Sequence, residues 1–312
     1  AVSRNSATVP SLHYASPIND KLFFGFSITS PFGSSTNFPM DGIQRNFATK
    51  SSIQTINLSP SIAYKINDKF SVAVGIDAMK MDATLNQVTA FGPIANEASS
   101  WGYGWHVGGL YQFNPGTRVG LSYRSSVAQR LNGKSQVEGR TPSNALTTNI
   151  KLPAMTTLGI HHEVTSKWAL MGSINYTQWN TVDSIVLNGL GLPAPYNTST
   201  LPQNFRNTWR ASVGTAYELN DKWLVRVGVG YDQTPTNDKD RALRLPDNNR
   251  WLVGIGARYR ITKQLSLDGG WTRAFIQDAS INNTSSVTGE TLRGNTKNAA
   301  DIIGLQLTWD LM

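Results

Sequence analysis

Hydrophobic and polar residues alternate along several segments of the chain. In the segment 223–232, the odd positions are Trp, Val, Val, Val and Tyr, whereas the even positions are Leu, Arg, Gly, Gly and Asp. The same alternation recurs in 251–260 and 101–111, and in a weaker form in 70–77 and 209–218. Because successive side chains of a β-strand point to opposite faces of a sheet, each segment is predicted to be a strand with one apolar and one polar face.

The connections between these segments alternate in length. Tight turns lie near 17–20, 67–69, 114–116, 165–167, 220–221 and 262–263. Longer polar loops lie near 31–49, 88–98, 132–148, 188–203, 234–248 and 280–297. This alternation is typical of an antiparallel up-and-down meander, in which each strand pairs with its sequence neighbours. We count about thirteen strands. Closing such a sheet removes its exposed edges, so we predict an all-β chain that forms a single β-barrel domain over residues 1–312.

The position of the apolar face decides which solvent surrounds the barrel. The apolar face carries Trp or Tyr near both ends, as at Trp223 and Tyr231 or Trp251 and Tyr259. Eight residues at about 3.3 Å each, tilted by roughly 45°, span about 19 Å, which fits rings at the borders of an apolar band of roughly 25 Å. The other face carries Gly, Ser, Arg and Asp, which suit a wet lumen. We therefore predict a transmembrane barrel of the Gram-negative outer membrane. A large soluble β-sandwich or propeller is the alternative, and it would have to cover or expose a dozen apolar stripes.

Composition excludes several classes of protein. The 312 residues carry a formal net charge of +8 and include no Cys, so disulfide scaffolds, zinc fingers and thiol catalysis are excluded. No stretch approaches the roughly 20 apolar residues that a membrane helix needs.

The chain has four His and no HExxH, GxSxG or Walker pattern, and we expect no enzymatic activity, metal or cofactor. Its cations are scattered, which argues against nucleic acid. Loop cations are expected near anionic lipopolysaccharide, for example Arg45, Lys50, Arg130 and Lys134.

Several short runs carry a family resemblance in their order and spacing. They are the residues from Val9 to Asp20 and from Gly25 to Ser30, together with the runs 101–105, 121–125, 152–155, 245–247 and 250–251. Over essentially its whole length the chain resembles the FadL-type outer-membrane transporters of long-chain fatty acids and other hydrophobic compounds. The resemblance implies a monomeric barrel of fourteen strands with an N-terminal plug in the lumen. It also implies that a hydrophobic ligand enters at the outer loops, reaches an internal pocket and leaves passively into the membrane beside a kinked third strand. The chain begins where the second strand of the family begins, so the plug and the first strand are expected to precede these residues. One further strand would also bring thirteen to the even number that bacterial barrels have.

The resemblance also directs attention to the ligand site. Two basic positions that hold a carboxylate in fatty-acid members correspond here to Gln87 and Leu201, which are neutral. A neutral hydrocarbon is therefore expected more strongly, although the cations Lys151, Arg206 and Arg124, predicted to face inward, are possible substitutes. A solvated lumen wall is the plainer interpretation of these three. The apolar candidates expected to face inward in the outer half are Met79, Met81, Leu85, Met155, Met171 and Trp179. Flexible Met suits an adaptable ligand pocket, and it equally suits filling beneath the loops.

The strand from Lys50 to Ile66 is the candidate for the lateral exit. Pro60 has no backbone N–H, so it removes a ladder bond from a strand that is paired on both sides. We therefore place the gate at Asn57, Ser59 and Pro60; an edge position for Pro60 is the alternative.

Three functional classes follow from the sequence: a transporter of hydrophobic small molecules, a general diffusion porin with a polar lumen, and a structural or adhesive barrel.

Overall fold

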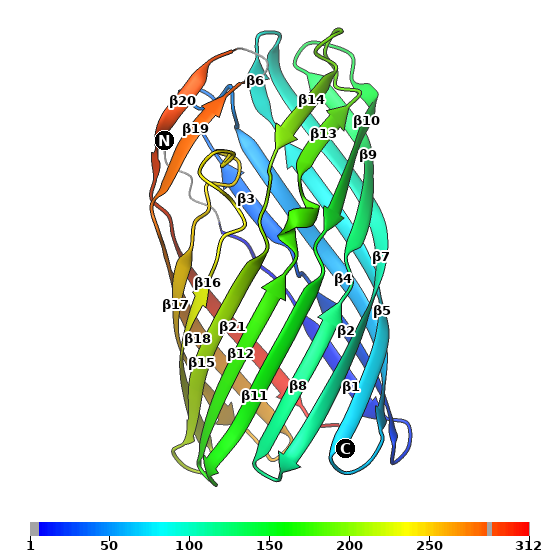
Figure 1. Cartoon of the computed structure of the whole chain (residues 1–312), viewed down its shortest axis with the longest axis vertical. Helices are drawn as coiled ribbons and strands as arrows, with labels where there is room; N and C mark the ends of the chain where they lie inside the picture. Colours follow the sequence, from blue (N-terminus) through cyan, green and yellow to red (C-terminus); the bar gives the residue numbers. More distant parts are fainter. Residues whose placement is uncertain (1–5, 286–288, 312) are drawn as a thin grey trace.

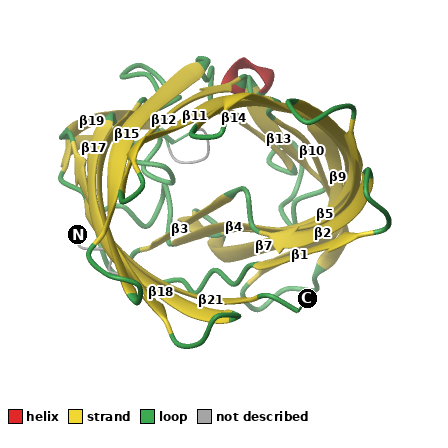
Figure 2. Cartoon of the chain, turned by 90° about the horizontal axis from the view of Figure 1, so that it is seen from below, coloured by secondary structure: helices red, strands yellow, loops and turns green. Residues whose placement is uncertain are grey.

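The computed structural model describes residues 6–285 and 289–311. Nineteen strands form one antiparallel sheet that curls around a lumen, and β19 and β20 form a separate hairpin (Figures 1 and 2). The first eleven strands are β1 (Leu12–Pro17), β2 (Leu22–Thr29), β3 (Gly33–Asn37), β4 (Lys50–Lys65), β5 (Phe70–Leu85), β6 (Gln87–Thr89), β7 (Gly92–Asn114), β8 (Thr117–Arg124), β9 (Val127–Val137), β10 (Ser143–Leu152) and β11 (Met155–Thr165). They are followed by β12 (Trp168–Thr177), the 3₁₀ turn η1 (Trp179–Thr181), β13 (Ser184–Asn188), β14 (Thr198–Pro202), β15 (Thr208–Glu218), β16 (Trp223–Asp232), β17 (Arg250–Arg260), β18 (Leu265–Ile276), β19 (Ala279–Thr284), β20 (Thr291–Thr296) and β21 (Ala299–Trp309).

These strands build thirteen rows of the barrel wall. Five pairs of strands continue one another across a short break, namely β2/β3, β8/β9, β10/β11, β12/β13 and β14/β15, and β6 is a short addition beside β7. The ladders run in one antiparallel series from β1, which pairs with β2, to β21, which pairs with β18. Within the described residues no ladder joins β1 to β21. The predicted meander and the number of rows are confirmed.

The short connections at one end of the barrel are stabilised by their own side chains. The carboxamide oxygen of Asn67 accepts hydrogen bonds from the backbone N–H groups of Lys69 and Phe70, both at 2.9 Å. Asn19 and Asn220 make the same pair of bonds in their turns. Asn favours such turns because its side chain replaces a backbone acceptor. The polar residues of the sequence pattern therefore place these turns and hold the strands in register.

The apolar face of the lower wall points outward, as predicted. Val227 and Ile255 are 56% and 55% exposed, and the outward aromatic rings pair across strands at both ends of the stripe. Trp223 and Tyr259 have ring centroids 4.8 Å apart, and the rings of Tyr231 and Trp251 are 5.0 Å apart. No helix among the described residues is long and apolar enough to cross a membrane. An apolar exterior that exposes this much hydrocarbon is stable when lipid surrounds it.

The opposite face of the same strands forms a polar lumen. Arg226 and Arg258 both point inward and bind the carboxylate of Asp268, at 2.5 and 2.9 Å. At the loop end of β16 and β17, Arg250 and Arg210 of β15 share the carboxylate of Asp232, at 2.9 and 3.0 Å. This part of the lumen therefore carries paired charges that hold one another in fixed positions.

Candidate functional site

The half of the barrel that bears the long loops has an apolar interior. Met79 and Met81 on β5 are fully buried, and they pack in one cluster with Phe32, Val127 and Leu131. Ala83, Ile150 and Leu152 complete the buried part of this cluster, which we term the inner cluster, and Met155 and Trp179 pack against it. The ring of Trp179 meets the edges of two other rings, those of Phe32 at 5.7 Å and Phe205 at 5.9 Å. The lumen therefore contains an apolar region in its outer half.

A second cluster continues this apolar surface toward the loops. It joins Leu85 at the end of β5 to buried side chains of β7, β9, β10 and the β13–β14 hairpin. These side chains are Ile94, Val137, Leu146, Leu187, Leu190 and Leu192. Leu201 lies at its border and is partly buried. The two clusters provide apolar contacts from the loops down to the middle of the barrel.

Five of the six apolar candidates from the sequence lie in these two clusters. Met79, Met81, Leu85, Met155 and Trp179 are all brought together there. The expectation that Met171 lies in the outer half of the barrel is wrong. Met171 pairs with His161, three residues from the start of β12, and so it lies near the short-turn end. The inner cluster also contains five residues that the sequence did not single out, although Ile150 and Leu152 flank the polar Lys151 beside a predicted long loop. These residues are Phe32, Val127, Leu131, Ile150 and Leu152.

Lys151 points out of the barrel, so the expectation that it faces inward is wrong. Ile150 and Leu152 are buried in the inner cluster, and Lys151 between them is exposed. Met155, four residues later, nevertheless points inward. The pattern shifts by one residue at Pro153 and Ala154, where β10 ends and β11 begins. Odd-numbered residues therefore face outward in β10 and inward in β11. An uninterrupted alternation of faces along the chain does not predict this change.

The other two candidate cations are already engaged or exposed. Arg206 is exposed in the segment between β14 and β15, and its Nε donates to the carbonyl oxygen of Thr234 at 3.2 Å. Arg124 faces the lumen and lies 3.7 Å from the carboxylate of Asp77. The negative charge of Asp77 at this distance partly neutralises Arg124. Arg124 therefore attracts a further anion less strongly.

Arg244, which the sequence did not single out, reaches into the site from the loop between β16 and β17. Its guanidinium donates to Ser51 Oγ at 2.9 Å and to the carbonyl oxygen of Asn86 at 3.1 Å, and it also binds the side-chain oxygen of Gln87. These acceptors are all neutral. Burial lowers the pKa of Arg244 to about 10, because removal of water disfavours the charged form. The neutral position Gln87 is therefore in contact with a cation from another part of the chain.

The β16–β17 loop that carries Arg244 is held to other outer loops. Leu243 packs with Phe38 and Ala48 of the segment between β3 and β4, and with Leu292 of β20. The backbone N–H of Leu243 also donates to Asn283 Oδ1 of β19 at 3.0 Å. The loop therefore extends from β16 and β17 to the wall at β4 and β5, which sequence distance alone could not predict.

The ladder between β4 and β5 is interrupted at the predicted position. The ladder of β4 with β2 runs without a break from Leu22↔Tyr64 to Thr29↔Asn57. The ladder with β5 has the partners Leu58↔Ala78 and Ser61↔Gly75, and none for Ser59 and Pro60 between them. The wall is therefore paired on one side of Pro60 and unpaired on the other.

Polar side chains connect this interruption to the lumen. The buried carboxylate of Asp77 accepts hydrogen bonds from Asn57 Nδ2 at 2.7 Å and from Ser59 Oγ at 2.6 Å, both through Oδ1. Its Oδ2 lies 3.1 Å from His106 Nδ1, and Arg124 approaches from β8. Gly75 makes room for this group, because a Cβ there would clash with the His106 ring and with the carbonyl oxygen of Pro60. We term this group the Asp77 cluster; it joins β4 to β5 through side chains where the backbone ladder fails.

A second break lies in the row formed by β2 and β3. Thr29 pairs with Asn57 and Gly33 pairs with Gln54, so the register against β4 changes by one residue across 30–32. Thr55 Oγ1 accepts a hydrogen bond from the Phe32 backbone N–H at 3.0 Å and donates to its carbonyl oxygen at 2.6 Å. These bonds fix the turn that directs the Phe32 ring into the inner cluster.

An outward-facing apolar band, a polar lumen and an enclosed greasy region define an outer-membrane transport protein. The chain belongs to the family described as "Outer membrane protein transport protein (OMPP1/FadL/TodX)", whose model matches residues 2–311. Members of this family are outer-membrane transporters and not enzymes.

Curated relatives and solved structures agree with this assignment. The chain is 29% identical to a "Long-chain fatty acid transport protein" of Escherichia coli, over 85% of this chain and 69% of the relative. It is 26% identical to "Outer membrane protein P1" of Haemophilus influenzae, over 97% and 75%. The fold matches that of a Pseudomonas aeruginosa FadL homologue with a TM-score of 0.89, at 23% identity over 97% of this chain and 78% of that one. The Ralstonia pickettii toluene transporter TbuX gives 0.69, at 17% identity over 96% and 80%.

Proposed function

We propose that this protein takes up hydrophobic small molecules through the outer membrane, with the inner cluster as the internal binding site. The observation that supports this most is the burial of flexible side chains, Met79 and Met81, beside the aromatic rings of Phe32 and Trp179 in the lumen of a membrane barrel. Adaptable thioethers beside aromatic rings suit apolar ligands of varied shape. The names of the relatives, fatty-acid and toluene transporters, support the same class of ligand.

The test is uptake by cells that lack other transporters of this kind. Cells that express the full-length natural protein are expected to accumulate a radiolabelled long-chain fatty acid or monoaromatic hydrocarbon faster than cells with the empty vector. Met79→Lys should abolish this increase in ligand accumulation, because it places a charge in the apolar inner cluster. The matched control is Met171→Lys, since Met171 faces the lumen outside both clusters. Steady ion conductance in planar bilayers, without any gain in uptake, would favour a general diffusion porin instead.

The charge of the ligand is proposed from Arg244. A half-buried guanidinium with only neutral acceptors retains its charge for an anion, and it lies beside Asn86, the residue that follows Leu85 of the second cluster. A carboxylated ligand would then place its head near Arg244 and its tail along the apolar clusters. Arg244→Gln is expected to lower uptake of a fatty acid about tenfold or more. Uptake of a neutral hydrocarbon should stay within about twofold, and equal loss for both ligands would contradict this role.

The exit route is proposed at the interrupted ladder between β4 and β5. The chain has no Cys, so a cysteine pair can be introduced without interference. Leu58→Cys with Ala78→Cys joins the partners next to the interruption, whereas Tyr64→Cys with Val72→Cys joins partners in the continuous ladder. Oxidation of the first pair is expected to slow uptake reversibly, and oxidation of the second should have no effect. Normal uptake through the oxidised first pair would exclude this exit and direct attention to the break at 30–32.

A further inference from the structure

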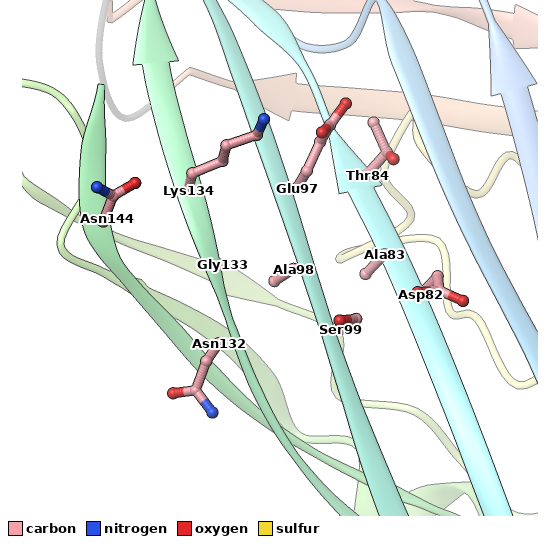
Figure 3. Close-up of a pocket in the computed structure, with 10 residues that line it drawn as sticks. All are labelled: Asp82, Ala83, Thr84, Glu97, Ala98, Ser99, Asn132, Gly133, Lys134 and Asn144. Atoms are coloured by element: carbon pink, nitrogen blue, oxygen red, sulfur yellow. The ribbon is translucent and has the colours of Figure 1, made fainter. Parts of the chain in front are cut away.

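Two grooves lie on the outer surface of the wall, and their charges differ. The first, of about 530 Å³, is formed by residues of β5, β7, β9 and β10, and Figure 3 shows its lining. It combines the carboxylates of Asp82 and Glu97 with the amine of Lys134. The second groove, of about 610 Å³, is lined by Ala128, Gln129, Arg130, Asn149, Ile150, Lys151, Thr181, Val182 and Ser184. We term it the cationic groove, because its lining includes two cations and no carboxylate.

The cationic groove exists because two rows of the wall separate there. Below it, β11 and β12 pair up to Met155↔Thr177, and above it β10 meets β13 only at Thr147↔Asn188. Between these points the rows are held by two bonds: Gln178 donates its backbone N–H to Ala154 at 3.0 Å, and Thr181 Oγ1 donates to the Lys151 carbonyl oxygen at 3.1 Å. The inner cluster closes the bottom of the gap through Ile150. A groove with an apolar floor therefore opens on the exterior of the barrel.

The two cations stand on the same face of one ladder. Arg130 is the cross-strand partner of Asn149, and Lys151 lies two residues further along β10. Such diagonal neighbours are roughly 7 Å apart, so a single phosphate group fits between them. Arg130 and Lys151 are exposed, and within the described residues neither side chain forms an ion pair. Asp183 lies in sequence between the lining residues Val182 and Ser184, but it is not one of the residues that line the groove.

The height of the groove on the barrel identifies its partner. On the outward face, Thr156 pairs with Tyr123 on one side and with Tyr176 on the other, which marks the upper aromatic level of the wall. Lys151 lies five residues from Thr156 toward the loops. At about 3.3 Å per residue and a tilt of roughly 45°, this places Lys151 about 12 Å beyond the apolar band. The amine and the guanidinium can also bend toward the membrane on their long side chains, so they reach the layer of lipid head groups.

We propose that the cationic groove binds a phosphate group of lipopolysaccharide in the outer leaflet. A phosphate monoester carries a charge of about −1.5 to −2 and several acceptor oxygens, which two adjacent cations match in charge and geometry. The amide of Asn149 and the hydroxyl of Ser184 supply neutral donors beside them. The apolar floor at Ile150 and Val182 suits the hydrocarbon part of the same lipid. This site is independent of the proposed uptake route, because Arg130 and Lys151 face away from the lumen.

The test measures binding of lipid A to the full-length protein in detergent. Native mass spectrometry compares lipid A with two phosphates, lipid A without phosphate, and inorganic phosphate at millimolar concentration. The variant is Arg130→Gln with Lys151→Gln, and the matched control is Lys167→Gln with Lys222→Gln, two exposed cations of the short turns. A third variant, Arg130→Lys with Lys151→Arg, keeps both charges.

The expected result has three parts. The wild type and the control should bind bisphosphorylated lipid A with equal affinity, the Gln variant should bind it roughly tenfold or more weakly, and the charge-keeping variant should recover most of the binding. Lipid A without phosphate should bind weakly to all four proteins. Equal lipid A affinity in the Gln variant and the control would overturn the site. Tight binding of inorganic phosphate alone would overturn the assignment to a membrane lipid. Ligand uptake should be unchanged in the Gln variant, so that failure of this site is distinct from failure of the proposed function.

Discussion

The Asp77 cluster permits a quantitative prediction about the interrupted wall. Asp77→Ala removes the acceptor of Asn57 and Ser59 and the counterion of Arg124 in one step. Each hydrogen bond to a charged group contributes about 1.5–3 kcal/mol. Because Asp77 is fully buried, loss of the carboxylate also leaves a partly buried guanidinium without its ion partner, and breaking a buried pair costs about 3–5 kcal/mol. We therefore expect Asp77→Ala to lower the free energy of unfolding by about 3–5 kcal/mol. Asp77→Asn, which keeps one acceptor oxygen, should lower it by about 2 kcal/mol.

The assay is urea unfolding in lipid vesicles, followed by tryptophan fluorescence. Asp82→Ala on the same strand is the matched control, since the ion pair of Asp82 with Lys80, at 3.4 Å, is solvent-exposed. Exposed pairs contribute about 0–1 kcal/mol. If the free energies of unfolding of Asp77→Ala and Asp82→Ala differ by less than about 1 kcal/mol, then side-chain bonds do not join β4 to β5 at this point and the reasoning is refuted.

Three further predictions follow from the faces of the wall. Val227→Arg, on the lipid side of β16, should lower the free energy of unfolding by about 2–4 kcal/mol, and a Val227→Arg protein as stable as the wild type would contradict the membrane exterior. Met79→Ala should cost about 2–5 kcal/mol in the same urea assay, because it empties part of the inner cluster, whereas Met171→Ala, outside the cluster, should cost clearly less. Asp268→Ala should make the lumen more selective for anions, whereas Arg226→Ala should not, because only the first change leaves cations without a carboxylate. Reversal potentials in a salt gradient measure this difference in selectivity.

Much of the fold follows from local pattern. A period of two assigns each side chain of a strand to one of two faces, and short turns between such segments set antiparallel pairing. That is why the sequence predicts the thirteen rows, the outward position of Val227 and Ile255, and the inward position of Met79 and Met81. Pro60 could be selected for an equally local reason, since a residue without an N–H cannot complete a ladder.

The site depends on information that is not local. The phase of the alternation shifts between β10 and β11, so Lys151 and Met155 face opposite ways although both occupy odd positions. Met171 has the inward face that the pattern predicts, but its height along the barrel follows from its pairing with His161. No periodicity assigns the height of a residue, because the stagger between neighbouring strands fixes it.

The sequence by itself therefore determined the class of this protein: a membrane barrel, its strands, its two faces and its family resemblance. Only the tertiary structure decided which loop residues reach the lumen, where two rows separate, and which cations stand free on the outer wall. Arg244 illustrates the difference, because it contacts Ser51 across 193 residues of chain. The alternation of faces is fixed by the backbone of each strand alone, whereas such a contact exists only after the sheet has curled and brought distant rows together.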